Sequence, residues 1–292
     1  MIGEKMCSIF KYKNCVGRNF DYEVSYQEEL RIIEKGEHYN DSRIIGMCTG
    51  LVDDEPLMYD GMNGYGLVCG ALAFEGNAYY YPHDEDKFSP GAYEFVNYIL
   101  RNFHSVEQAK DFISHDNFQI GDTQYSDDFP NSDLHWFIAD KKESIVVEQT
   151  KNGLNIYNGS VMTNNPVYSV QKHEYDTYKD MIGDNEYFEN LYNTRGMETS
   201  GLDGSYTSDG RFERLSFLKE QLEKHQGMKT LEPDALDVAN SFHLLSSVEQ
   251  IYGATPVNDK FEYTIYSIVY DMKNLNVYYK FYNNIGVLTD NL

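Results

Sequence analysis

The segment CSIFKYKNCVGRNFDYE, residues 7–23, determines the fold expected for the N-terminal part of this chain. Two runs rich in apolar, aromatic and β-branched residues, Cys7–Tyr12 and Cys15–Phe20, lie on either side of the dipeptide Lys13-Asn14. Strand-like runs separated by a two-residue polar turn are typical of a β-hairpin. The sequence therefore predicts two antiparallel strands, with Cys7 near the open end of the hairpin.

The register of this hairpin decides which side chains meet. If Lys13-Asn14 is the turn, Cys7 lies opposite Phe20. Because side chains alternate along a strand, Cys7, Arg18 and Phe20 then share one face. Arg18 becomes a diagonal neighbour of Cys7, about 7–8 Å away along the backbone and within reach of a long side chain. Asp21 lies just beyond Cys7, where the α-amine of Cys7 would be if the preceding residues were removed.

The hairpin permits two interpretations of Cys7. A thiol at a chain terminus has its own α-amine as a nearby base, a neighbouring guanidinium favours the thiolate, and an aspartate orients the amine. In the other interpretation, Arg18 and Asp21 form a surface ion pair and Cys7 packs as an inert thiol. The hairpin alone favours this second interpretation, because short local motifs often occur without the function they suggest.

The remaining sequence indicates a mixed α+β domain. Strands are expected over 43–52, 67–74, 134–140, 144–150 and 161–164, helices over 89–103, 105–115, 211–223 and 233–245, and a final hairpin over 263–272 and 275–283. Strands that are grouped, rather than alternating with helices, favour a layered α+β arrangement over βαβ units. No repeat and no Pro/Gly/Ser-rich linker divides the chain, so a single domain is expected.

Composition and charge exclude several classes of function. The chain has 47 Asp and Glu against 24 Lys and Arg, a formal net charge of −23. This charge argues against nucleic acid and against an anionic membrane surface as partners. No apolar run approaches the roughly 20 residues that a transmembrane helix needs. The first six residues lack the apolar stretch of a signal peptide, so a cytoplasmic protein is expected.

The sequence contains no motif for a cofactor or a metal. The glycines of GMNGYG (61–66) precede no helix that could bind a phosphate, and DGSYTSDG (203–210) lacks the Gly and Glu placement of a calcium loop. The four cysteines include no CxxC pair and make no disulfide framework. His135 is expected to be a hydrogen-bonded core residue. A hydrolase that pairs an internal thiol with one of the eight histidines stays open.

Six segments in a fixed order add information that the hairpin lacks. They are CSIF…VGRNFDYE (7–23), YDGMNGYGLVCGAL (59–72), LHWFIADKKESIVVEQT (134–150), VMTNNP (161–166), GSYTSDGRFERLSFLK (204–219) and EYTIYSIVYDMKNLNVYY (262–279). Together they resemble the choloylglycine hydrolase family, which contains bile salt hydrolases and penicillin V acylases. The resemblance spans nearly the whole chain and outweighs the inert interpretation of Cys7.

The resemblance implies the N-terminal nucleophile (Ntn) hydrolase fold, a four-layer αββα sandwich of two antiparallel sheets between helices. It also implies hydrolysis of linear, non-peptide amide bonds. By motif, Cys7 is implied as the nucleophile, with Arg18 and Asp21 of GRNFD beside it. Asn164 of TNNP is implied as an oxyanion-hole amide, and Arg211 of SDGRF as the second arginine of the site. One oxyanion donor is typically worth about 3–4 kcal/mol.

The sequence departs from the family pattern in three places. Residues 1–6 precede Cys7, whereas many members begin directly with Met-Cys. They are expected to be a propeptide or an upstream start that is removed, leaving residues 7–292 as one Ntn-hydrolase domain. The first hairpin is also shorter than usual. Where bile salt hydrolases usually carry Asn in GLNF, and penicillin V acylases often a Tyr, this chain reads ALAF with Ala73. The backbone N–H of Ala73 is still expected to serve the oxyanion hole.

The expected substrate is an amide with a bulky apolar acyl group, held by aromatic side chains such as Phe20, Tyr65 and Phe129. Conjugated bile salts come first and penicillin V second, and other N-acyl amides, including acyl homoserine lactones, stay open. The alternative of a different class is a non-catalytic relative that binds an amide or lipid while MIGEKM blocks Cys7. No cofactor is implied, and family members are commonly homotetramers.

Overall fold

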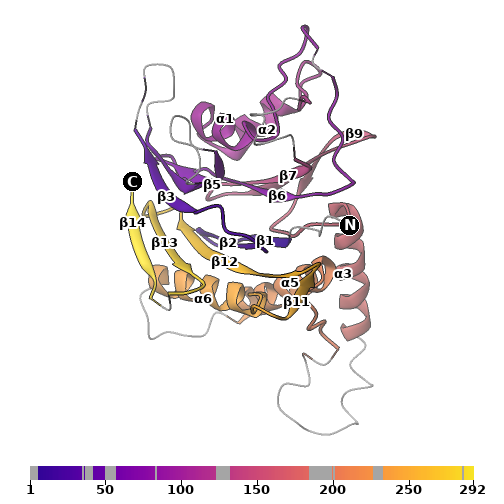
Figure 1. Ribbon diagram of the computed structural model, residues 1–292, viewed down its shortest axis with the longest axis vertical. Helices are drawn as coiled ribbons and strands as arrows, with labels where there is room; N and C mark the ends of the chain where they lie inside the picture. The colour runs from indigo at the N-terminus through magenta and orange to yellow at the C-terminus, as the bar shows by residue number, and fades with distance from the viewer. Residues whose placement is uncertain are drawn as a thin grey trace, which may run out of the picture.

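Two β-sheets pack face to face between two layers of helices (Figure 1). The computed structural model describes residues 6–34, 36, 42–49, 57–82, 84–122, 132–183, 199, 201–225, 233–284 and 286–292. Its helices are α1 (Phe95–Asn102), α2 (Val106–Ile113), α3 (Tyr168–Gly183), α5 (Ser208–Lys224) and α6 (Pro233–Ser247). In Figure 1, α1 and α2 cover one sheet, while α5 and α6 cover the other with α3 beside α5. The α+β, αββα arrangement expected from the sequence is confirmed.

The first sheet has the strand order β10-β1-β2-β12-β13-β14, with β11 paired to β12. Its strands are β1 (Met6–Tyr12), β2 (Cys15–Tyr22), β10 (Val161–Met162), β11 (Thr255–Val257), β12 (Lys260–Asp271), β13 (Asn276–Phe281) and β14 (Leu288–Asn291). The pairs between these strands are antiparallel. The N-terminal hairpin therefore occupies the middle of the sheet, between β10 and the long strand β12.

The second sheet is a meander in which each strand pairs with the next along the chain, from β3 to β9. Its strands are β3 (Glu29–Ile33), β4 (Ile44–Cys48), β5 (Met58–Asn63), β6 (Val68–Ala73), β7 (Leu134–Ala139), β8 (Ser144–Thr150) and β9 (Gly153–Asn158). Helix α1 packs on β5 and β6. Apolar residues of β4 to β8 and of α1 and α2 form a buried cluster on this outer face.

The N-terminal hairpin has the register expected from the sequence. Tyr12 pairs with Cys15 and Cys7 with Phe20. Of the two turn residues only Lys13 has a positive φ, of 50°, so the turn is not type I′, which needs a positive φ at both positions. Gly17 lies opposite Phe10, and a Cβ on Gly17 would come within 2.6 Å of the Phe10 ring. The ring thus requires glycine at that position.

One face of the hairpin packs against the second sheet. Ile9, on the same face as Cys7, approaches Gly70 of β6 so closely that a Cβ there would lie 2.8 Å from Ile9 Cδ1. The opposite face packs on α5 and α6, which contribute Phe212, Leu215 and Leu245 to the buried cluster of the first sheet. Cys7 therefore faces the space between the sheets, and Ser8 faces the helices.

Most expected elements are present, with shifted ends. The helix expected over 89–103 begins only at Phe95, because Pro90 and Gly91 interrupt its first turns. The strand expected over 43–52 is β4, and residues 50–52 lie outside the described residues. Helix α3 was not expected from the sequence. Its described buried residues are Tyr168, Gln171 and Tyr175, which form a narrow stripe with little aliphatic content.

Candidate active site

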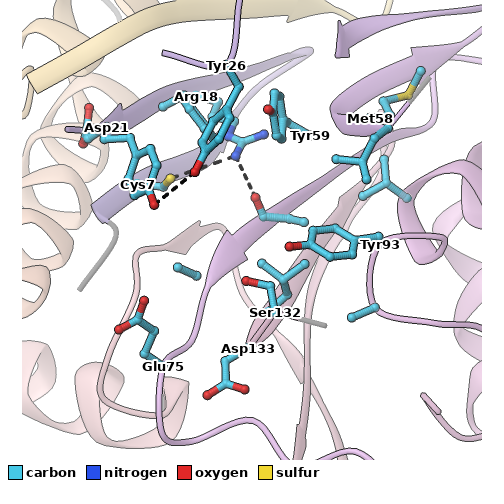
Figure 2. Close-up of a pocket in the computed structure, with 18 of the residues that line it drawn as sticks. Cys7, Arg18, Asp21, Tyr26, Met58, Tyr59, Glu75, Tyr93, Ser132 and Asp133 are labelled. Atoms are coloured by element: carbon cyan, nitrogen blue, oxygen red, sulfur yellow. Dashed lines mark hydrogen bonds between the residues drawn. The ribbon is translucent and has the colours of Figure 1, made fainter. Parts of the chain in front are cut away.

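A cavity of about 560 Å³, lined by residues of both sheets, lies beside the N-terminal hairpin (Figure 2). It forms where β5 and β6 separate: their pairing ends at Asp60 and Gly70, and β6 runs on to Ala73 paired with β7. Ala71 and Ala73 line the cavity. The end of β6 thus presents backbone groups to the cavity instead of to a neighbouring strand.

Cys7 lies in the wall of this cavity with its backbone held on both sides. The residue is only 4% exposed. Its N–H donates to Asn164 Oδ1 over 2.7 Å, and its carbonyl oxygen accepts from Arg211 Nη1. Arg18 Nη2 lies 4.0 Å from the Cys7 sulfur, and Figure 2 marks this contact with a dashed line. The structure thus brings Cys7, Arg18, Asn164 and Arg211 into one site.

The Cys7 thiol experiences opposing electrostatic effects. Burial raises its pKa above the ordinary value, the Arg18 guanidinium lowers it, and the Asp21 carboxylate raises it. The backbone N–H of Asp21 also donates toward the sulfur, which favours the thiolate. The net pKa is raised, so the thiol is protonated at neutral pH and needs a base before it can attack a carbonyl carbon.

Arg18 is fixed by groups that the sequence did not identify. Its Nη1 pairs with Asp60 Oδ2 of β5, and its Nη2 donates to the Ala71 carbonyl oxygen over 2.7 Å. Asp60 also accepts hydrogen bonds from the hydroxyls of Tyr266, at 2.5 Å, and Tyr270. Arg18 is 1% and Asp60 0% exposed. A buried guanidinium can keep a fixed direction toward the sulfur only because this carboxylate balances its charge.

Asp60 carries one sequence signal that could have revealed its role. It is the single acidic residue within the strand MYDGMN, whose neighbours on both sides are apolar, aromatic or glycine. A carboxylate in such a strand is costly unless it is paired. With Arg18 already assigned to the facing sheet, an ion pair across the two sheets was the simplest way to satisfy both charges.

Arg211 connects the start of α5 to Cys7. The helix is capped by Thr207, whose side chain accepts from the Gly210 N–H. Arg211 Nε donates to the Tyr206 carbonyl oxygen over 3.0 Å, and Nη2 donates to Asn164 Oδ1 over 2.9 Å. Arg211 is fully buried. It therefore does more than cover the first turn of its helix, since it contacts both Cys7 and Asn164.

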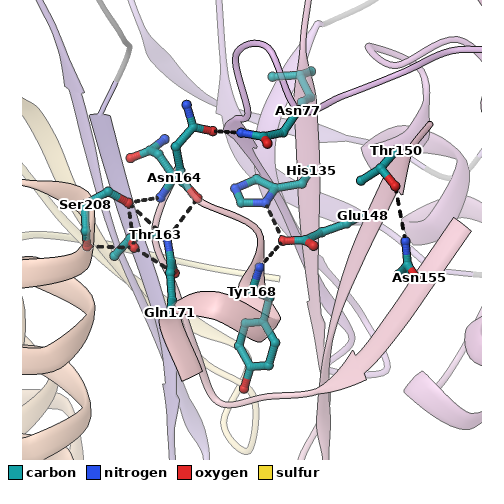
Figure 3. Close-up of polar contacts among 12 residues, drawn as sticks. Asn77, His135, Glu148, Thr150, Asn155, Thr163, Asn164, Tyr168, Gln171 and Ser208 are labelled. Carbon is teal, nitrogen blue, oxygen red and sulfur yellow. Dashed lines mark hydrogen bonds and ion pairs between the residues drawn. The ribbon is translucent and has the colours of Figure 1, made fainter. Parts of the chain in front are cut away.

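The loop that carries Asn164 is held by side chains from two helices (Figure 3). Its N–H donates to Ser208 Oγ over 2.8 Å, and its carbonyl oxygen accepts from Gln171 Nε2 over 3.0 Å. The side-chain Nδ2 donates to the Ala73 carbonyl oxygen over 2.9 Å. Asn164 is 3% exposed, so its amide has one well-defined orientation beside Cys7.

Ala73 lies at the end of β6 and lines the cavity. In an extended strand the N–H and C=O of one residue point to the same edge. The Ala73 carbonyl oxygen is contacted by Asn164, so its N–H lies on the edge that faces Asn164 and the cavity. The methyl side chain, 5% exposed, offers no polar contact to a substrate.

Asp21 is buried beneath the end of the hairpin. Its carboxylate accepts from Thr264 Oγ1 over 2.6 Å and from Gln250 Nε2 over 3.2 Å. Burial raises the pKa of the Asp21 carboxyl to about 6, against the opposing effect of Arg211 and of these hydrogen bonds. Asp21 pairs with Met6 across the strands, which places it beside the peptide that precedes Cys7.

The raised pKa of Asp21 predicts a pH dependence of stability. An unfolded Asp has a pKa near 3.9, so between about pH 4 and 6 the folded chain binds more protons than the unfolded chain. The contribution of this carboxyl to the free energy of unfolding therefore falls as the pH rises through this window. We expect the free energy of unfolding of the parent minus that of Asp21→Asn to decrease by on the order of 2 kcal/mol from pH 4 to 7. Urea unfolding of both proteins at each pH measures it, and a constant or growing difference contradicts it.

Of the three aromatic residues expected to bind substrate, the structure places one in the cavity and one away from it. Phe20 lines the cavity, with its ring stacked on Tyr266 at 5.2 Å between centroids. Tyr65 does not line the cavity: it follows the Asn63-Gly64 turn at the far end of β5, is 39% exposed, and stacks on His104. The turn reverses the chain away from the site, so this prediction was wrong. Phe129 lies outside the described residues.

Other groups that line the cavity were not identified from the sequence. They are aromatic and aliphatic residues from the end of β2 and the segment after it, from β5 and from α1 and the turn before it, namely Tyr22, Tyr26, Met58, Tyr59, Tyr93 and Val96. Glu75, Ser132 and Asp133 supply polar groups on the side of the cavity away from Tyr26 and Tyr59 in Figure 2. Aromatic residues are frequent throughout this chain, so no spacing in the sequence marked these as a pocket.

His135 is a core residue, as its position in an apolar strand indicated. It is 1% exposed, its ring stacks on Phe74, and its Nδ1 lies 3.4 Å from Glu148 Oε1 (Figure 3). Within the described part of the chain, no histidine lines the cavity. The same residues contain no group of three or more His, Cys, Asp or Glu side chains that could hold a metal ion, and no helix long and apolar enough to cross a membrane.

Comparison with known proteins places this geometry in context. The family model for linear amide C–N hydrolases of the choloylglycine hydrolase family matches residues 7–292, so the match starts at Cys7. The bile salt hydrolase/transferase of Lactiplantibacillus plantarum is 36% identical over 302 residues, which cover 96% of this chain and 90% of the relative. That of Clostridium perfringens is 32% identical over 289 residues, covering 92% and 85%.

Solved structures agree with the fold. A mutant of the conjugated bile acid hydrolase from Clostridium perfringens superimposes with a TM-score of 0.84 at 28% identity, covering 98% of this chain and 92% of that chain. The penicillin V acylase from Agrobacterium tumefaciens superimposes with a TM-score of 0.76 at 20% identity, covering 98% and 86%. The second similarity is one of fold alone.

Proposed function

The chain belongs to the choloylglycine hydrolase family of linear amide C–N hydrolases, and we propose that it hydrolyses conjugated bile salts with Cys7 as an N-terminal nucleophile. The observation that supports the proposal most is the set of contacts around Cys7. Arg18 lies at its sulfur, Asn164 at its N–H and Arg211 at its carbonyl oxygen. A buried structural cysteine needs none of these partners.

The reaction begins once Cys7 is the first residue. Its α-amine takes the thiol proton, and the thiolate attacks the carbonyl carbon of the substrate amide. The C–N bond breaks, the amine product leaves with the proton from the α-ammonium group, and the acyl group remains on Sγ as a thioester. Water, deprotonated by the same amine, then attacks the thioester. The acid product leaves and the thiol is restored.

The residues around Cys7 have separate roles in these steps. Arg18 stabilises the thiolate, because its guanidinium is fixed near the sulfur. Asn164 Nδ2 and the backbone N–H of Ala73 are the donors to the oxyanion, and each such donor is typically worth about 3–4 kcal/mol in the transition state. Arg211 orients Asn164 through Oδ1. Asp21 orients the α-amine from beneath the hairpin.

The cavity favours a large, rigid acyl group. Its volume of about 560 Å³ lies within the range of ligand pockets, and its wall beyond Cys7 is mainly aromatic and aliphatic. A fused-ring acyl group buries apolar surface against Phe20, Tyr59 and Tyr93 with little loss of conformational entropy. Glu75 and Asp133 can accept hydrogen bonds from hydroxyl groups on such a ring system. These features place bile salts ahead of penicillin V, whose acyl group is smaller.

The apolar side chain of Ala73 supports a second candidate class of substrates. The family position that usually carries Asn in bile salt hydrolases has no polar side chain here. Penicillin V and other N-acyl amides, including acyl homoserine lactones, are therefore the alternative substrates. We also propose that residues 1–6 are removed, since the family match begins at Cys7, and that the mature chain, residues 7–292, acts as one domain in a homo-oligomer.

A substrate panel tests the proposed function. Protein whose N-terminus has been determined by intact mass is incubated with glycine- and taurine-conjugated bile salts, penicillin V and an acyl homoserine lactone, and the released amine is measured. We expect the bile salt conjugates to have a kcat/KM at least about tenfold above the others, which corresponds to about 1.4 kcal/mol in transition-state binding. Faster hydrolysis of penicillin V or the lactone contradicts the substrate assignment. No hydrolysis of any amide by the mature chain supports a non-catalytic binding protein.

A further inference from the structure

Glu262 is a buried carboxyl group directly beneath the residue that precedes the nucleophile. It lies near the start of β12 and is 1% exposed. Its Oε1 accepts a hydrogen bond from the Met6 N–H over 2.6 Å. Its Oε2 is buried, and no described residue donates a hydrogen bond to it. A carboxyl group in this position is costly to bury, which calls for a function.

The surroundings of Glu262 increase that cost. Burial, together with the neighbouring Asp21 carboxylate, raises the pKa of Glu262 to about 8, and Arg211 lowers it only in part. The side chain does not line the substrate cavity. It is also absent from every step proposed for amide hydrolysis. Its one polar contact among the described residues is with a residue that the mature enzyme lacks.

The contacts of Met6 and Cys7 fix the peptide bond between them. Met6 is the first residue of β1 and pairs with Asp21, so the residue before the nucleophile is part of a strand. Glu262 holds the Met6 N–H, and Asn164 holds the Cys7 N–H, which is the nitrogen of the Met6–Cys7 peptide. Arg211 holds the next carbonyl oxygen. Side chains from three segments far apart in the sequence thus hold the backbone on both sides of the Met6–Cys7 peptide bond.

We propose that Glu262 is a positioning residue for the removal of residues 1–6, an inference that rests on the proposed role of Cys7. In this step Cys7 Sγ attacks the Met6 carbonyl carbon and the C–N bond breaks. The thiol proton goes to the departing nitrogen, which becomes the α-amine. Water then hydrolyses the thioester, giving a Met6 carboxylic acid and a free thiol. Glu262 exchanges no proton in this scheme; it keeps Met6 extended, so that its carbonyl carbon stays beside the sulfur.

Intact-mass spectrometry of the full chain tests the inference. Glu262→Leu removes the acceptor, Glu262→Gln keeps an acceptor oxygen, and Ser267→Ala is the matched control, a buried polar residue of β12 that does not contact Met6. We expect Glu262→Leu to lose residues 1–6 about five- to tenfold more slowly than the parent, the size expected from losing one hydrogen bond of about 1 kcal/mol. Glu262→Gln should stay within about threefold and Ser267→Ala within about twofold.

A second chain that starts at Met6 separates this role from a general effect on folding. There the initiator methionine alone precedes Cys7, so no cleavage of the Met6–Cys7 peptide by the protein is needed. We expect Glu262→Leu in this chain to hydrolyse amides as the Met6-start parent does. Removal of residues 1–6 at the parent rate in full-length Glu262→Leu overturns the inference, as does equal loss of activity in both chains. A parent that retains residues 1–6 also overturns it, while the Met6-start parent independently tests the amidase function.

Discussion

Replacing Cys7 by alanine is expected to abolish amide hydrolysis, lowering kcat by about 10,000-fold or more. The expected loss is this large because the described residues that line the cavity hold no second thiol, and no histidine that could act as the base for a hydroxyl nucleophile in its place. Among the described residues that line the cavity, Cys7 is the only thiol, and serine is represented by Ser132 alone on the opposite side. The variant should be made in the chain that starts at Met6, because the full-length form would also keep residues 1–6. Amine release from a glycine-conjugated bile salt is the measurement.

Cys15→Ala is the matched control for this variant. Cys15 belongs to the same hairpin and is also buried. It is the first residue of β2, next to the turn, whereas Cys7 lies at the open end of the hairpin. Burial raises the pKa of its thiol to about 12, so it is not a nucleophile at neutral pH. We expect kcat within about twofold of the parent. A Cys7→Ala protein that keeps more than about one tenth of the parent kcat would contradict the mechanism.

Replacing Asp60 by alanine is expected to cost about 3–5 kcal/mol of unfolding free energy. The substitution leaves the Arg18 guanidinium buried without its counter-charge and removes the acceptor for the hydroxyls of Tyr266 and Tyr270. An exposed pair offers the contrast: Lys172 and Asp176 on α3 are 47% and 49% exposed, and Asp176→Ala should cost less than about 0.5 kcal/mol. Urea unfolding at neutral pH measures both changes.

A double variant distinguishes a lost charge pair from a general packing defect. Arg18→Met combined with Asp60→Leu replaces both charges by apolar groups, which is often close to neutral in protein interiors. We expect the double variant to be at least about 2 kcal/mol more stable than Asp60→Ala, yet without activity, because the cation at the Cys7 sulfur is gone. An Asp60→Ala protein within about 1 kcal/mol of the parent would show that this ion pair is not the element that holds Arg18.

The sequence predicted the parts of the site that depend on local rules or on motif order. The two-residue turn set the register that brings Arg18 beside Cys7, and strand alternation placed both on the face between the sheets. Asn164 and Arg211 could not be located by any local rule, since 157 and 204 residues separate them from Cys7. Only the ordered set of six segments indicated that they meet.

The partners of these residues were harder to predict. Asp60 pairs with Arg18 across the two sheets, and Glu262 contacts Met6 across β2 within the first sheet. Their roles therefore depend on how the sheets stack and on the strand order, which a single sequence does not specify. Helix α3 was not predicted because its described buried stripe consists of two tyrosines and a glutamine, and its opposite side is exposed and highly charged. The error at Tyr65 has the opposite cause: an aromatic residue after a turn has the composition of a pocket residue but lies at the wrong end of its strand.

The central claim is that Cys7 becomes the first residue and then carries the acyl group. The most direct measurement is intact-mass and peptide-mass spectrometry of the full-length protein, mixed with a glycine-conjugated bile salt and quenched with acid during turnover. The account predicts a chain that begins at Cys7, with the mass of one bile acyl group added to the peptide that contains this residue. A chain that retains residues 1–6 yet hydrolyses the conjugate, or an acyl group found on any other residue, would contradict it.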